Sequence, residues 1–427
     1  MTVQLPQREV RRSFVLGVVN GALFEFAERL IDPPLVLTWF VSRLTSSNLL
    51  IGLVAPLGDA GWFLPQVFIA GLVQRMPRKM LSYALAAVVR VLSWLLVAAA
   101  VWLVDDPTLL LVTFFVLYGV ARLAAGLGGL GFFEVVAKTI PANRRGSFFA
   151  WRLLTGGLLG LGAGAVTREV LNRFAFPQGH AMLFALYTAV VTPAMLAFML
   201  IREPPGTAVP TTPTLKQQLR RAGQFLRTDA VFRRYMGMRT ALGLAGIALP
   251  FYGVYARNVL GAPEGMVGIY VAVRVAAGLL ANLPWGALSD RKGNRRVALW
   301  LALGSGLTAL LALGLVGWVA VSPYRGPWLP YLAVPLFLLN GALMPAGFLV
   351  GSNFLLELVP ETERPLYLGL SNTLVGIVVL ISGFGGLVVD LLGYAGLFAL
   401  SALLCLLAWW WSRGLPEPRV GQPLREG

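Results

Sequence analysis

Long apolar runs divide the chain into twelve segments, which the pattern predicts to be membrane-spanning helices. A helix needs about 20 apolar residues to cross the hydrocarbon core of a bilayer. The runs do not alternate with a period of two, so barrel strands are excluded, and helices remain as the way to satisfy backbone polar groups in lipid. The predicted spans cover residues 13–40, 48–73, 80–104, 109–136, 148–168, 181–201, 235–256, 264–288, 297–320, 330–356, 367–390 and 394–412.

Composition leads to the same class of protein. Of the 427 residues, 57% are hydrophobic and only 13% are charged. A soluble domain of this size cannot hide that much apolar surface. The chain is therefore expected to be an all-α integral membrane protein.

The distribution of Lys and Arg predicts the orientation, because positive residues near span ends stay in the cytoplasm. The two terminal segments and every second loop hold 24 of the 35, and six lie inside spans. Both termini are thus expected in the cytoplasm, with the chain in the plasma or inner membrane. The net charge of +16 is explained by this topology and by contact with anionic lipid, without a nucleic-acid partner. The alternate loops hold only Arg43, Arg168, Arg173, Arg257 and Arg325.

The longest break between spans lies in the middle of the chain. It begins with four prolines and continues from 215 to 226 as an amphipathic basic stretch, which predicts a linker followed by a helix on the inner leaflet. The expected organisation is an N-terminal six-helix bundle at 1–201, a cytoplasmic linker at 202–235, a C-terminal six-helix bundle at 236–412 and a cytoplasmic tail at 413–427.

The two halves are related to each other in sequence. A shift of 216 residues superposes Pro34 on Pro250 and Gly52 on Gly268, and a shift of 219 aligns the loop at 141–145 with the loop at 360–364. Parallel six-span halves are a known transporter plan, with the binding site near the midplane between them.

The loop after the eighth span resembles the loop signature of the major facilitator superfamily, a large family of secondary transporters. The matching residues are Gly286, Asp290, Arg291, Gly293, Arg295 and Arg296. The copy in the first half keeps Arg75, but Gln74 replaces the Asp and Pro77 replaces the Gly. The resemblance implies two pseudo-symmetric six-helix bundles. Physically, an Asp beside Arg at a helix end can latch neighbouring helices in one state, and positive-inside anchoring of the arginines is the alternative.

A charged face occurs inside the first predicted span. Glu25, Glu28, Arg29 and Asp32 have the spacing i, i+3, i+4, i+7, which is one face of a helix. Each charge at mid-bilayer costs about 2.5 to 3.5 kcal/mol on insertion scales. Arg29 can neutralise part of this face, and the remaining carboxylates require partners on other spans. The candidates are Asp59, Arg90, Arg122, Arg152, Arg239 and Arg274.

The family resemblance predicts where these charged residues lie in the fold. The first, fourth, seventh and tenth spans of the family line a central cavity, so the four charged residues of the first span, Arg122 and Arg239 are the proton- and substrate-binding candidates. Glu25 or Glu28 would carry the proton, with Arg122 as the modulating charge. Arg122 followed by Gly126 and Gly128 is also similar to a signature of the family's drug/proton antiporters, although Ala125 replaces the usual Gln and the fifth span lacks the expected Gly-Pro pair.

These features predict a secondary transporter that works by alternating access, with proton-coupled export of an amphipathic or hydrophobic compound as the first hypothesis. Uptake of a small polar or organic-anion nutrient is the alternative, and a non-transporting sensor or assembly factor is the alternative from another class. A monomer without a metal or cofactor is expected, and an enzyme is not. The single His180 and single Cys405 cannot build a metal cluster or disulfide, and His180 is predicted to be solvated in an outer loop.

Overall fold

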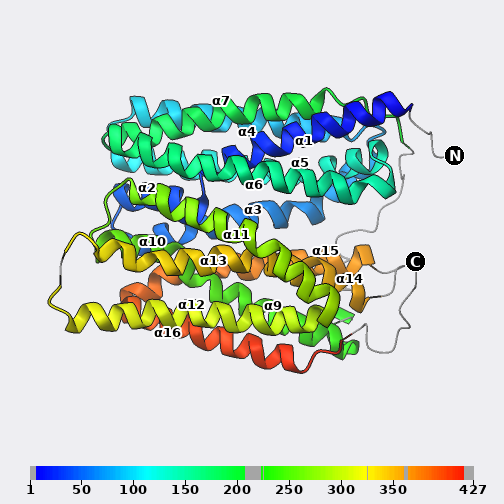
Figure 1. The fold of residues 1–427 in the computed structure, drawn as a ribbon. Coiled ribbons are helices and arrows are strands. Elements are labelled where there is room, and N and C mark those ends of the chain that lie inside the picture. The colour runs from blue at the N-terminus through cyan, green and yellow to red at the C-terminus, as the bar shows by residue number, and fades with distance from the viewer. Residues whose placement is uncertain (1–5, 207–222, 225, 325, 360–363, 418–427) are drawn as a thin grey trace.

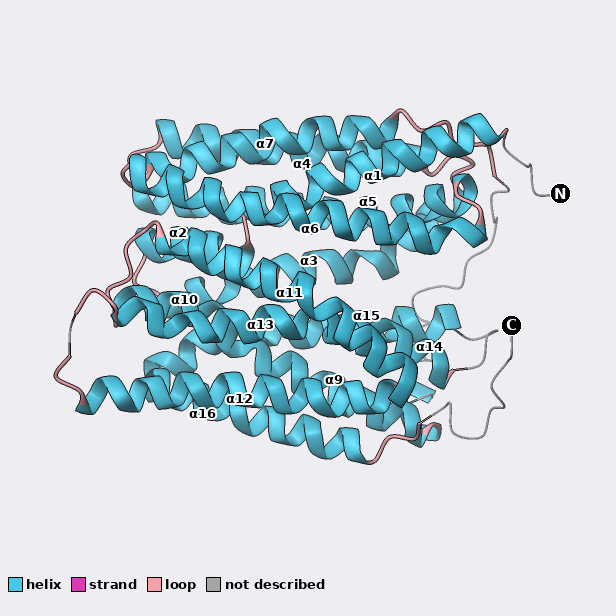
Figure 2. Cartoon of the chain, in the orientation of Figure 1, coloured by secondary structure: helices cyan, strands magenta, loops and turns pink. Residues whose placement is uncertain are grey.

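The computed structural model describes residues 6–206, 223–224, 226–324, 326–359 and 364–417. Within these residues the chain is helical and contains no strand (Figure 2). The helices form two groups, one from each half of the sequence, and the beginning of α1 lies at the same end of the molecule as the end of α16 (Figure 1). The opposite end is called the outer end below.

The N-terminal group contains the first six spans. The first span is broken into α1 (Gln7–Leu30), the π-helical turn η1 (Pro33–Leu37) and α2 (Thr38–Leu44). The next five are continuous helices: α3 (Asn48–Arg75), α4 (Met80–Leu103), α5 (Pro107–Thr139), α6 (Ala142–Arg173) and α7 (Gln178–Met199).

The C-terminal group contains three interrupted spans. The seventh consists of α9 (Ala230–Ala245), η2 (Gly246–Ala248) and α10 (Leu249–Asn258). The eighth and ninth are α11 (Met266–Lys292) and α12 (Asn294–Val321). The tenth comprises η3 (Leu329–Ala333), α13 (Val334–Phe348), η4 (Leu349–Asn353) and α14 (Phe354–Leu358). The last two are α15 (Arg364–Ser382) and α16 (Gly385–Arg413), and α16 is broken at Gly393, whose φ is 66°.

Helices therefore lie at all twelve predicted spans, and the all-α prediction is confirmed. Nine helices in the described part of the chain are long and apolar enough to cross a membrane. The described helices of the first and seventh spans do not meet that criterion, and the eleventh contributes a shorter apolar helix, Tyr367–Ser382. Of the predicted surface helix at 215–226, residues 223, 224 and 226 are helical, and the rest lies outside the described residues.

Two prolines break the first span beside its charged face. Pro33 and Pro34 follow Asp32, and α1 ends at Leu30, because proline lacks a donor and clashes with the preceding turn. The Asp32 carbonyl then accepts hydrogen bonds from the amides of Leu35 and Leu37 at 3.2 and 3.3 Å. The break leaves the Asp32 side chain buried, at 2% exposure, beside the C-terminal group.

The two groups meet closely where α6 crosses α11. A Cβ on Gly164 would lie 2.7 Å from both the Ala272 Cβ and the Gly268 carbonyl oxygen, so the two backbones approach as closely as small residues permit. From this crossing near the outer end the two helices diverge toward the end that holds the start of α1 (Figure 1).

Candidate functional site

Glu28 is the centre of a charged cluster that joins four helices of the N-terminal group. Its carboxylate accepts hydrogen bonds from Arg90 Nη1 on α4 at 3.3 Å, from Arg122 Nη1 on α5 at 3.4 Å and from Tyr187 Oη on α7 at 3.0 Å. Arg122 Nε also donates to the Gly58 carbonyl oxygen at 2.9 Å. Glu28, for which the helical spacing within the first span predicts no partner, is therefore bound by two arginines from other spans.

A second centre links the two halves. Arg274 Nη1 on α11 donates to both carboxylate oxygens of Asp32, at 2.7 and 2.5 Å. Arg274 Nε donates to Asn340 Oδ1 on α13 at 2.8 Å. The Asp32 and Arg274 side chains are only 2% and 10% exposed. Because such a pair is shielded from water, loss of either partner would leave an uncompensated buried charge between the halves.

Arg29 lies between these centres on α1. It contacts Glu25 at 3.0 Å and Asp32 at 3.7 Å, which are the two pairs that the helical spacing predicts. The Glu25 side chain is 40% exposed, and Asp59 on α3 is also exposed, within electrostatic range of Arg122 and Arg274. The cluster thus combines four acids, Glu25, Glu28, Asp32 and Asp59, with four arginines, Arg29, Arg90, Arg122 and Arg274.

Further polar contacts join the halves at the outer end. Arg257 Nη1 donates to the carbonyl oxygen of Ser42 at 2.8 Å. Glu264 accepts from Trp39 Nε1 at 2.8 Å and lies 3.5 Å from Arg43. Asn48 Nδ2 donates a hydrogen bond to Asp390 Oδ1 at 2.6 Å.

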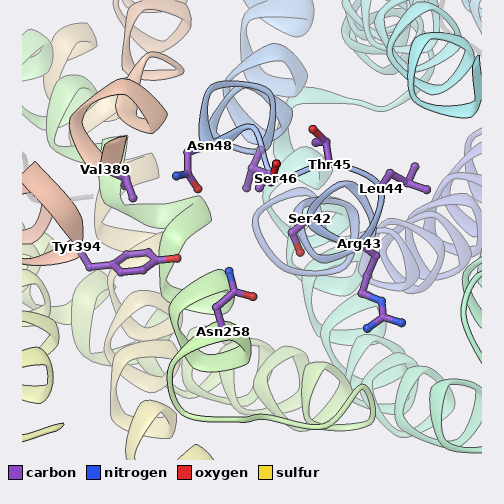
Figure 3. A pocket seen from close by; sticks show the side chains of 10 residues that line it. Ser42, Arg43, Leu44, Thr45, Ser46, Asn48, Asn258, Val389 and Tyr394 are labelled. Carbon is purple, nitrogen blue, oxygen red and sulfur yellow. The ribbon is translucent and has the colours of Figure 1, made fainter. Parts of the chain in front are cut away.

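These contacts border a pocket of about 520 Å³, lined by residues of both halves. Figure 3 shows Tyr394 and Asn258 on one side of it and Ser42 and Asn48 on the other. The outer end is therefore closed by direct contacts around a small polar pocket.

The loop signature of the second half forms a sharp turn between α11 and α12. Gly293 has φ 81° and ψ 163°, a conformation that favours glycine. The Arg295 amide donates to Glu417 at 3.0 Å, and Arg295 Nη2 donates to the Arg413 carbonyl oxygen at 2.8 Å. The signature thus ties α12 to the segment after α16. Asp290, Arg291 and Arg296 are exposed beside this turn, whereas Gly286 lies within α11.

The first half has an equivalent set of contacts, which the sequence analysis did not predict. Both sets, in which an acid after the last helix of a half binds the loop signature region, are called clasps below. Glu203, four residues beyond the end of α7, accepts hydrogen bonds from the amides of Lys79 and Met80 at 2.8 and 2.6 Å and pairs with Lys138 at 2.5 Å. Glu417 likewise lies four residues beyond α16. The sequence feature that could have predicted this contact is an acid four residues after the last helix of each half. Arg75, the predicted signature residue of this half, is the exposed last residue of α3.

Other sequence-predicted candidates lie apart from the cluster's contacts. Arg239 Nη1 contacts Tyr235 Oη at 3.4 Å within α9, and Arg152 donates to Asn20 Oδ1 at 2.9 Å. The prediction for His180 is wrong: it lies in the first turn of α7, is 1% exposed and packs against Phe40 and Phe184. No group of three or more residues that could hold a metal occurs in the described part of the chain.

Residues 236–427 match the family model described as Major Facilitator Superfamily. No curated protein matches the sequence. Solved transporter structures match almost the whole chain. The D-xylose-proton symporter has a TM-score of 0.72 and 17% identity, covering 97% of this chain and 100% of its own. The nucleoside transporter NupG has a TM-score of 0.66 and 15% identity, covering 94% and 98%.

A bacterial homologue of the iron transporter ferroportin, in an inward-facing state, has a TM-score of 0.68 and 13% identity, covering 96% and 100%. At these identities the likenesses show the fold. The predicted architecture of two six-helix bundles is therefore confirmed.

Proposed function

We propose that the chain is a proton-coupled transporter of a small molecule in the major facilitator superfamily, because residues 236–427 match that family's model and the whole length shares the fold. It is a multi-pass membrane protein that works by alternating access. The excess of Lys and Arg in the terminal and alternate segments supports cytoplasmic termini. The outer end, closed in this structure, would then face away from the cytoplasm.

The observation that carries the proposal is the Glu28 cluster. A carboxylate held by Arg90, Arg122 and Tyr187 is costly to place inside a membrane protein, and such groups commonly mark proton or substrate pathways. Structural pairing alone would need one arginine, whereas Glu28 has two. Movement of one arginine toward a substrate would remove one of these two counter-charges and make Glu28 easier to protonate.

Glu25 supports a route for that proton. Its side chain is 40% exposed and has one arginine partner, Arg29, so water reaches it more easily than Glu28. Arg29 also contacts Asp32, which in turn holds Arg274 of the other half. Protonation of Glu25 would release Arg29 toward Asp32 and weaken the link to Arg274. Proton binding and opening of the outer end would thereby be coupled through four neighbouring side chains.

The substrate proposed first is an amphipathic compound that the protein exports. Phe24 packs against the Arg90 guanidinium at 5.0 Å and Phe26 is half-buried on the same helix, so apolar surface adjoins the charged groups. The likeness of the Arg122 segment to the antiporter signature agrees with export.

The second candidate is uptake of a small polar or anionic nutrient. It is favoured by the four arginines of the cluster, whose guanidiniums bind carboxylates and phosphates in bidentate geometry. Uptake and export differ in direction, so accumulation inside inverted and right-side-out vesicles separates them.

Proteoliposomes test coupling. A thermal-shift screen of drugs and organic anions first identifies a compound that binds, and its flux is then measured with and without a pH gradient. Glu25→Gln and Glu28→Gln should abolish the dependence on the gradient. Glu9→Gln, which changes an acid in the first turn of the same helix, is the matched control. Full gradient dependence in both cluster variants would refute the proposal.

A further inference from the structure

A groove of about 570 Å³ lies along the crossing of α6 and α11, on the flank of the seam between the halves. Both helices are long and apolar enough to span a membrane, so a groove on their outward side would meet lipid. Its walls come from both halves: Leu161 and Ala165 on one side, Ile269 and Val273 on the other. The open flank of a membrane protein at this depth meets acyl chains.

One end of the groove carries a positive charge. Arg168 lines it, is exposed and makes no ion pair within the described residues. The neighbouring Glu169 is neutralised by Arg173. Arg168 lies five residues before the end of α6, or about 7 Å below it at 1.5 Å per residue. That depth suits a lipid headgroup. Topology does not require a cation there, because positive residues collect on the cytoplasmic side.

We propose that this groove binds one phospholipid with an anionic headgroup. The phosphate would be held by Arg168 and the amide of Asn172, and an acyl chain would run along Leu161, Ile269 and Val273 toward the membrane centre. Glu169 also lines the groove but is paired with Arg173, so the cation of Arg168 favours an anionic headgroup over a zwitterionic one.

The bound lipid would also favour the outer-closed arrangement. Its two walls stand together only while α6 and α11 touch at Gly164 and Gly268, so separating the halves at the outer end would dismantle the site. A ligand that binds one of two states shifts the equilibrium toward that state. The lipid would thereby act as a brace across the seam.

Native mass spectrometry and hydrogen exchange of the full chain test this. The protein is compared in nanodiscs of phosphatidylcholine and in nanodiscs that also contain phosphatidylglycerol. Phosphatidylglycerol should be retained by the protein and should slow exchange in residues 161–173 and 266–273. Arg168→Gln should lower its retention about tenfold, the loss expected for one charge-assisted contact. Arg78→Gln, an exposed cation at the other end of the molecule, should retain it as the wild type does.

A second variant separates loss of the site from loss of the fold. Ala165→Leu fills the groove without changing charge, and should lower retention while leaving thermal stability in detergent unchanged. Equal retention by Arg168→Gln and the wild type would overturn the proposal. So would equal slowing of exchange in phosphatidylcholine, or slowing by soluble glycerol phosphate in place of the lipid. These readouts require no transported substrate and stand apart from the transport proposal.

Discussion

Replacing Asp32 with Asn should shift the protein toward a state that is open at the outer end. Asp32 and Arg274 form a bidentate contact between the halves, with side chains 2% and 10% exposed. In Asp32→Asn the Arg274 guanidinium keeps Asn340 but loses its counter-charge. In an open state both side chains would be solvated, so the substitution penalises the closed state selectively.

The magnitude follows from burial. Removing one partner of a buried ion pair typically costs about 3 to 5 kcal/mol, and Asn340 together with residual solvation argues for the lower value. About 3 kcal/mol corresponds to a change of roughly a hundredfold in the equilibrium between the two states. A protein with about 1% outer-open molecules would then become about half open.

Electron-spin distance measurements can read this shift. Leu103 at the end of α4 and Val321 at the end of α12 are 79% and 84% exposed and belong to different halves. Spin labels at both positions, in a background that carries Cys405→Ser, report the separation of the outer ends. Asp32→Asn should add a population at longer distance.

A second ion pair between the halves, also at the closed outer end, provides the control. Glu264 and Arg43 are 27% and 38% exposed, and pairs of this kind contribute about 0 to 1 kcal/mol. Glu264→Gln should therefore shift the populations less than about fivefold. The reasoning is refuted if Asp32→Asn and Glu264→Gln give the same distance distribution.

Three further predictions concern stability and the two clasps. Glu28→Gln leaves Arg90 and Arg122 without their shared counter-charge and should cost about 3 kcal/mol or more; an unchanged thermal midpoint in detergent would contradict this. Gly293→Ala forces a side chain into φ 81° and against Glu417, so it should cost at least about 1 kcal/mol. Gly286→Ala, a helical position with open space around it, should have no such cost. Glu203→Gln removes the charge that pairs with Lys138 and caps α4; limited proteolysis in the loop at 76–79 should accelerate, and a rate equal to wild type would argue against the clasp.

Local spacing predicted the pairs within α1 because a helix fixes which side chains are neighbours. The partners on other spans could be named only as a set of candidates. Their selection depends on tertiary packing, which brought Arg90, Arg122 and Arg274 to the acids. Arg152 and Arg239 received other contacts.

Neutral polar partners were harder to foresee. Tyr187 and Asn340 carry no charge, so their presence in a span shows no unusual cost that would draw attention to them. His180 was assigned to a solvated loop because the apolar run begins at 181. In the structure α7 already begins at Gln178, and the imidazole packs among aromatic rings.

The most direct test of proton-coupled transport through the Glu28 cluster compares two fluxes of one bound compound in proteoliposomes. Accumulation driven by a pH gradient requires the proton site, whereas exchange of labelled for unlabelled compound requires only alternating access. In Glu28→Gln we expect gradient-driven accumulation to be lost and exchange to remain. Accumulation at the wild-type level in this variant would contradict the account.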